Sequence, residues 1–130
     1  MCSYLKDKLE EALKKYGQTE LFILNTHSIN KNWDRNTFED TVSIPQISYL
    51  KLRAHLMKYG RILEEHIEES YYILSMPVEK NSGVNALLII LFGNDNVYHI
   101  AAYAKELPFL SHFSQTAVNT IAKELSTLDS

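Results

Sequence analysis

The chain has 130 residues, of which 45% are hydrophobic and 22% charged, and this size and composition are typical of one globular domain. Its 13 basic and 16 acidic side chains give a net charge of -3, which supplies no attraction for nucleic acid. No stretch approaches the roughly 20 apolar residues that span a bilayer. We therefore expect one domain, from 1 to 130, that binds neither nucleic acid nor membrane.

The N-terminal segment points to a reducing compartment. It becomes charged at Lys6 and Asp7 and has no apolar core, so we expect neither a signal peptide nor lipidation of Cys2. Cys2 is the only cysteine, and a lone cysteine forms no internal disulfide. Both features agree with a cytoplasmic location.

The first expected element is a helix from Ser3 to Gly17. Its apolar residues recur at helical spacing and form one stripe: Leu5, Leu9, Ala12, Leu13 and Tyr16. Leu21 to Leu24 is a short apolar run and predicts a buried strand. Asn25 to Asp40 is rich in Asn, Asp and Thr and predicts a long polar loop.

The rest of the chain predicts a helix, a set of strands and a last helix. Pro45 suits the first turn of a helix that we expect to reach Gly60, and Arg61 to Glu69 fits either a strand or a helical turn. Turn residues separate the segments of an antiparallel meander: Tyr71 to Val78, Val84 to Phe92, and Val97 to Lys105. A helix with one broad apolar stripe follows Pro108. These elements predict an α+β fold in which N- and C-terminal helices flank a central antiparallel sheet.

Three short strings carry a resemblance to a known family. The segment from Leu56 to Leu63 resembles the Gly-Arg pair that precedes a strand in GAF domains. The segment from Leu74 to Val78 resembles the GAF strand that ends in proline and an aliphatic residue, and the segment from Gly83 to Ile90 resembles the turn before the very apolar central strand of that family. Together with the order of the elements, they make the chain similar to GAF sensor domains, which are relatives of the PAS fold. A PAS-like, roadblock-like or longin-like fold is the alternative for the same order of elements. The resemblance implies small-ligand sensing or dimer-mediated signalling, with no particular ligand.

The histidines do not predict a metal site. They stand at His27, His55, His66, His99 and His112. None of them forms an HxH or HExxH spacing, so we expect neither a metal nor another cofactor. His66 lies among the carboxylates of Glu64 to Glu69, which either favour its charged form or make a solvated acidic face.

No catalytic motif stands out, because the chain has no GxSxG elbow, CxxC pair or Gly-rich phosphate loop. His27 lies between Thr26 and Ser28, upstream of Asp34 and Asp40, and this is the one place where hydroxyl, imidazole and carboxylate groups cluster. Turn and capping chemistry explains the same residue types. We therefore expect a protein that is not an enzyme.

Two aromatic residues are candidates for ligand binding besides His27. Trp33 is the only tryptophan and lies in the expected polar loop, where it either lines a pocket or anchors the loop on the core. Tyr71 and Tyr72 must point to opposite faces of their strand, which leaves one hydroxyl for a ligand. The candidate ligand-binding residues are Trp33, His27 and Tyr72.

Both terminal helices carry apolar residues at the spacing that suits helix pairing between two chains. The predicted homodimer interface consists of Leu5, Leu9, Val118, Ile121, Leu125 and Leu128. The alternative is that both helices pack within a single chain.

Two functions therefore compete. The first is a non-enzymatic sensor or regulatory signalling domain of GAF type, with a small molecule as ligand and a homodimer or protein partner. The second is a protein-interaction domain without a small ligand, either an adaptor or a partner-neutralising protein, which docks through the acidic face from Glu64 to Glu69. A pocket beneath the segment Asn25 to Asp40 favours the first, and a filled core with an exposed patch favours the second.

Overall fold

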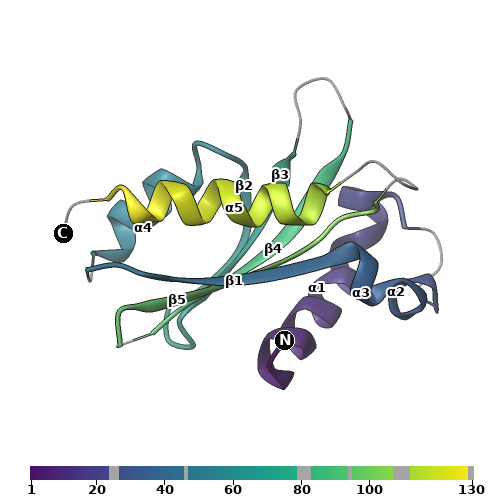
Figure 1. Ribbon diagram of the computed structural model, residues 1–130, viewed down its shortest axis with the longest axis horizontal. Coiled ribbons are helices and arrows are strands. Elements are labelled where there is room, and N and C mark those ends of the chain that lie inside the picture. The colour runs from purple at the N-terminus through teal and green to yellow at the C-terminus, as the bar shows by residue number, and fades with distance from the viewer. Residues whose placement is uncertain (24–26, 46, 79–82, 94, 107–111, 129–130) are drawn as a thin grey trace.

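The structure is a computed structural model that describes residues 1–23, 27–45, 47–78, 83–93, 95–106 and 112–128, with the backbone alone at 27 and 28. It is an α+β fold built on a five-stranded antiparallel sheet, with helices on both faces (Figure 1). The strand order is β1-β5-β4-β3-β2, so β1 and β2 form the edges. The predicted fold class is confirmed.

The described elements have the following bounds. The helices are α1 (Ser3–Leu21), α2 (His27–Lys31), α3 (Trp33–Asn36), α4 (Tyr49–Leu56) and α5 (Phe113–Ser126). The strands are β1 (Thr37–Ser43), β2 (Arg61–His66), β3 (Tyr71–Pro77), β4 (Asn85–Phe92) and β5 (Val97–Tyr103). No helix in the described ranges is long and apolar enough to cross a membrane.

The two faces of the sheet bury separate cores because successive side chains of a strand point to opposite faces. On one face, α1 places Leu5, Leu9 and Leu13 against Leu87 and Ile89 of β4. On the other face, the core contains Leu88 and Ile90 of β4 together with Val118, Ile121 and Leu125 of α5. The central strand is thus apolar at nearly every position, as the long apolar run around it predicts.

The predicted strand from Leu21 to Leu24 is wrong where the structure describes it. The helix α1 continues through Gly17 to Leu21 and ends at Phe22, whose φ of 57° is left-handed, and the amide of Ile23 donates to the carbonyl of Gly17. Leu21 and Ile23 are buried against the sheet, so the apolar run serves helix packing. Leu24 lies outside the described residues.

The predicted loop from Asn25 to Asp40 is also wrong in large part. This segment contains α2, α3 and the first half of β1. The strand β1 pairs with β5 on one side only, and its residues from Glu39 to Thr41 are exposed. A solvent-exposed edge strand has a polar composition, and composition alone does not distinguish it from a loop.

The remaining elements follow the predictions with shifted ends. The helix expected from Pro45 begins after Ser48, whose Oγ accepts from the amide of Lys51 at 3.3 Å. The ambiguous segment from Arg61 is the strand β2, with a register shift between Ile62 and Glu64. Before it, the backbone of Gly60 lies so close to the carbonyl of Ser75 that a Cβ at this position would overlap it. The meander and the last helix are confirmed.

Candidate ligand site

The three predicted ligand-binding residues are not brought together. Trp33 lies in α3 and packs on the core beneath α1, with its ring centroid 5.9 Å from that of Tyr103. Tyr72 lies in the core on the opposite face of the sheet. His27 belongs to α2, and its side chain lies outside the described atoms. The sheet therefore separates Trp33 from Tyr72.

The hydroxyl of Tyr72 is not free for a ligand. Its side chain is fully buried, and the hydroxyl donates to the carbonyl of Tyr49 at 3.4 Å. Burial disfavours the phenolate and raises the pKa of Tyr72 to about 12. Tyr71 points to the α1 face and is also buried, so the prediction that the two rings face opposite sides is confirmed.

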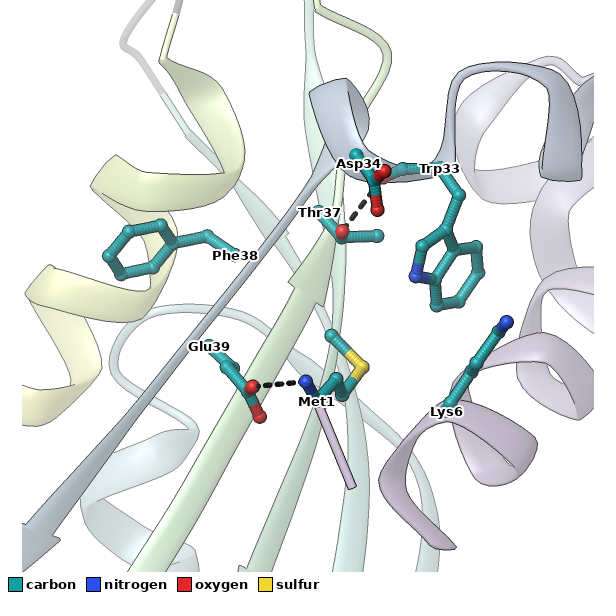
Figure 2. A pocket seen from close by; sticks show the side chains of 7 residues that line it. All are labelled: Met1, Lys6, Trp33, Asp34, Thr37, Phe38 and Glu39. Carbon is teal, nitrogen blue, oxygen red and sulfur yellow. Dashed lines mark hydrogen bonds and ion pairs between the residues drawn. The ribbon is translucent and has the colours of Figure 1, made fainter. Parts of the chain in front are cut away.

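Trp33 borders a hollow of about 440 Å³ that opens to solvent between the start of α1, α3 and β1 (Figure 2). We call it the Trp33 hollow. Its lining residues are Met1, Lys6, Trp33, Asp34, Thr37, Phe38 and Glu39. Figure 2 shows the ring of Phe38 turned toward α5 and away from Trp33, so the indole is the aromatic wall of the Trp33 hollow.

Hydrogen bonds hold the segment of backbone that carries the indole. Thr37 Oγ1 donates to the carbonyl of Trp33 at 2.7 Å, which fixes the end of α3 against β1. The adjacent Asn36 is buried; its Nδ2 donates to the hydroxyl of Tyr103 at 3.1 Å, and its Oδ1 accepts from the amide of Glu106 at 3.2 Å. These bonds fix the backbone of α3, from which the half-buried indole extends.

Charges of both signs surround the indole. Lys6 Nζ lies 5.7 Å from the centroid of the Trp33 ring, within the range of a cation–π contact. The carboxylates of Asp34 and Glu39 line the same hollow, and Glu39 accepts from the amine of Met1 at 2.7 Å, which raises the pKa of that amine. The Trp33 hollow thus combines a flat aromatic surface with a cation and two carboxylates among its lining groups.

A second polar cluster, which the sequence did not reveal, joins α1 to β2. The carboxylate of Glu64 accepts from the hydroxyl of Tyr16, from Lys15 Nζ at 2.9 Å and from His66 Nε2 at 2.6 Å. Partial burial alone would raise the pKa of Glu64, but these hydrogen bonds outweigh it and lower the pKa to about 2. The cluster joins residues almost fifty positions apart, which no local spacing could reveal.

Two carboxylates of the acidic face predicted around His66 pair with cations within the chain. Besides Glu64, Glu65 pairs with Arg53 at 2.6 Å and Glu69 lies 3.2 Å from His66 Nδ1. The ring of His66 stacks on Tyr71, with 4.3 Å between centroids. Less unpaired charge is therefore left for a partner than the sequence suggests.

A similar cluster joins α4 to α5. Glu124 lies 2.9 Å from His55 Nδ1 and accepts from the hydroxyl of Tyr59 at 2.9 Å. The bond with His55 contributes most to lowering the pKa of Glu124, and the bond with Tyr59 contributes next. Lys58 Nζ lies 3.6 Å away. The carboxylate of Glu124 thus connects α5 to the end of α4.

The six residues of the predicted dimer interface all belong to the core of a single chain. Leu5 and Leu9 lie beneath α1, and Val118, Ile121, Leu125 and Leu128 lie in the core on the α5 side. The two helices cover opposite faces of the sheet (Figure 1). These side chains cannot meet a second chain while the fold is intact, so a dimer needs another surface.

A metal site or a similarity to known proteins would each give independent evidence of function. Within the described ranges, no group of three or more His, Cys, Asp and Glu side chains is arranged to hold a metal ion. No protein-family model, no curated protein and no solved structure matches the chain. The case for a function therefore rests on the geometry of the chain itself.

Proposed function

We propose that the chain is a non-enzymatic, cytoplasmic regulatory domain of GAF type that binds a small ligand in the Trp33 hollow. The observation that carries this proposal is the indole of Trp33, held half-buried at the wall of an open hollow of about 440 Å³. Small-molecule sites typically have volumes of roughly 300–1,000 Å³ and combine an apolar wall with a few polar groups. The volume of the Trp33 hollow lies in this range, and the indole supplies an apolar wall among charged and polar lining groups.

The lining groups indicate the kind of ligand. A flat or aliphatic part can stack on the indole, while Lys6 attracts an anionic group and Asp34 a cationic one. A small zwitterion, such as an aromatic amino acid or its amine derivative, satisfies all of these groups at once. The bound molecule would connect α1, α3 and β1, so its binding would be communicated to the edge of the sheet.

Tryptophan fluorescence tests the proposal, because Trp33 is the only tryptophan and its emission reports on this site alone. We expect a small zwitterion from a panel of non-fluorescent metabolites to shift the emission in a saturable manner. Trp33→Ala should weaken binding at least tenfold by calorimetry, which corresponds to about 1.4 kcal/mol. Its effect on the free energy of unfolding should be smaller, since the ring is only half-buried.

Lys8→Ala is the matched control, since Lys8 lies on α1 near Lys6 but contacts Tyr4 and Tyr71 instead of Trp33. It should leave the affinity unchanged, whereas Lys6→Ala should weaken it. An emission spectrum that stays constant across the panel, or equal effects of Lys6→Ala and Lys8→Ala, would contradict the proposal.

A second candidate function, docking of a protein partner, is favoured by the outer side of α4. Leu50 and Met57 are 63% and 53% exposed, and the exposed Ala54 lies between them at helical spacing. This apolar stripe is the surface on which a homodimer could form. Leu50→Ser combined with Met57→Ser should abolish self-association in sedimentation experiments and leave the Trp33 response unchanged. A wild-type protein that sediments as a monomer at high micromolar concentration would rule out the homodimer.

A further inference from the structure

The strand β1 is an open edge of the sheet (Figure 1). It comes first in the strand order, so no other strand of the described chain pairs with its outer side. Its register with β5 runs without a shift from Thr37 to Ser43, and its sequence contains neither proline nor lysine. Bulges, prolines and charged side chains, lysine above all, are the usual devices that keep an edge from pairing with another chain, and of these β1 carries only the carboxylates of Glu39 and Asp40.

The hydrogen bonds at the two ends of β1 show which backbone groups face outward. Ala104 N donates to Asn36 O, and Ile44 N donates to Asn96 O, so the even-numbered positions 36 and 44 bond toward β5. Pairing alternates along an antiparallel ladder, so every even-numbered residue between them does the same. The odd-numbered residues therefore direct their N–H and C=O groups away from the sheet: Thr37, Glu39, Thr41 and Ser43.

One of these outward groups confirms the assignment. The amide of Thr41 donates to Oδ1 of Asp40 at 2.8 Å, a bond to a neighbouring side chain. An aspartate that accepts from an edge amide occupies the place of a carbonyl from an added strand. An incoming carbonyl could replace it and leave the carboxylate of Asp40 available for a positive charge.

The opposite edge, β2, is protected. Its register shifts between Ile62 and Glu64, and its acidic side chains are engaged by Lys15 of α1 and Arg53 of α4. Such a bulge interrupts regular pairing with a further strand. The two edges therefore differ, and β1 is the one suited to accept a strand.

Charge decides which strand would fit. Glu39 and Asp40 are exposed near the middle of β1 and lie on opposite faces of the sheet. In an antiparallel pair of two β1 strands centred there, these carboxylates would lie opposite or diagonal to one another, which destabilises the pairing. A strand with basic side chains at successive positions would instead place one cation near Asp40 and a second near Glu39, where it would share the carboxylate with the amine of Met1.

We propose that the outer edge of β1 binds an extended basic strand of a partner protein, which extends the sheet by one strand. The main-chain bonds come from the odd-numbered residues of β1, and Glu39 and Asp40 select for lysine or arginine. This inference goes beyond ligand binding in the Trp33 hollow and does not depend on it.

A synthetic peptide of the length of β1 tests the proposal, with a capped Val/Thr sequence and a central pair of lysines. Two controls carry glutamates in place of the lysines, or N-methyl groups at alternate amides so that the peptide cannot pair. In amide NMR spectra, the lysine peptide should shift the signals from Thr37 to Ser43 and slow hydrogen exchange at Glu39 and Thr41. Both control peptides should bind at least about tenfold more weakly, since each lacks the charge or the ladder bonds.

Matched variants at the two edges separate the proposal from general charge attraction. Asp40→Asn keeps an acceptor for the Thr41 amide and should lower the affinity for the lysine peptide several-fold. Glu65→Gln, on β2, should leave it unchanged. Equal binding of the N-methylated peptide, shifts at β2 in place of β1, or no shifts at millimolar peptide would overturn the proposal.

Discussion

At the scale of single residues, the carboxylate of Glu64 makes stability depend on pH. Its pKa is lowered from 4.5 to about 2, so the folded state holds the ionised form more tightly than the unfolded state. The resulting stabilisation is fully present above pH 4.5 and is lost as the pH falls toward 2. The bonds from Tyr16, Lys15 and His66 are its source.

Glu64→Gln should therefore lower the free energy of unfolding at neutral pH by about 1 kcal/mol, a charge-assisted bond discounted for solvent screening. It should also flatten the acid limb of the stability profile, measured by urea unfolding at a series of pH values. The exposed Glu68 supplies the control Glu68→Gln. Parallel profiles for Glu64→Gln and the unmodified protein would contradict the assignment.

Gly60 is required by a close approach between backbones. A Cβ at this position would overlap the carbonyl of Ser75 and lie 2.8 Å from Cβ of Met76. Gly60→Ala should destabilise the protein by about 1–3 kcal/mol, the usual cost of overpacking, as measured by thermal unfolding. Gly83→Ala tests strain alone, because no atom lies within 4 Å but φ is +72°. A larger loss for Gly83→Ala than for Gly60→Ala would show that the close approach is not limiting.

At the scale of elements, the two terminal helices are part of the core of a single chain. Leu9 of α1 and Leu125 of α5 are fully buried on opposite faces of the sheet. Leu9→Ala and Leu125→Ala should each lower the free energy of unfolding by about 2–5 kcal/mol. Met57→Ala, at an exposed position, should change it little. Leu125→Lys should unfold the protein, as measured by circular dichroism. If the Leu125→Lys variant instead stays folded and a dimer dissociates, the homodimer interface predicted from the sequence would be supported.

The sequence predicts most elements correctly, because the spacing of apolar residues distinguishes long helices from strands and because turn residues separate the strands of the meander. It fails where a short segment fits two periods or where composition reflects exposure. Leu21 belongs to α1 and is buried in a core that also contains residues of β3, β4 and β5, which are distant in sequence. Thr37 to Ser43 forms a strand because β5 supplies its hydrogen bonds, and nothing local reveals that partner.

At the scale of the whole molecule, the net charge predicts that the protein does not bind nucleic acid. The net charge of -3, with no basic run beyond Lys14 and Lys15, is unfavourable for binding a phosphate backbone. In an electrophoretic shift assay at physiological salt, we expect no complex with duplex DNA or with RNA. A salt-sensitive complex at micromolar concentration would contradict this prediction.

The candidate site could be predicted only in part. Trp33 is singled out by its isolation in a polar segment, and the structure places it at a hollow. Tyr72 looked equivalent in sequence, but the sheet places it in the core on the opposite face. The contributions of Lys6 and Glu39 arise from the meeting of α1 and β1, so they depend on tertiary contacts that local spacing does not encode.

The most direct test of ligand binding at Trp33 is an amide NMR titration of the intact chain with the small zwitterion selected by fluorescence. We predict saturable shifts of the Trp33 indole N–H and of the amides of Asp34, Thr37 and Glu39, with the signals of Leu50 and Met57 unchanged. Shifts confined to α4, or none at the Trp33 indole, would contradict the proposal that the Trp33 hollow is the functional site.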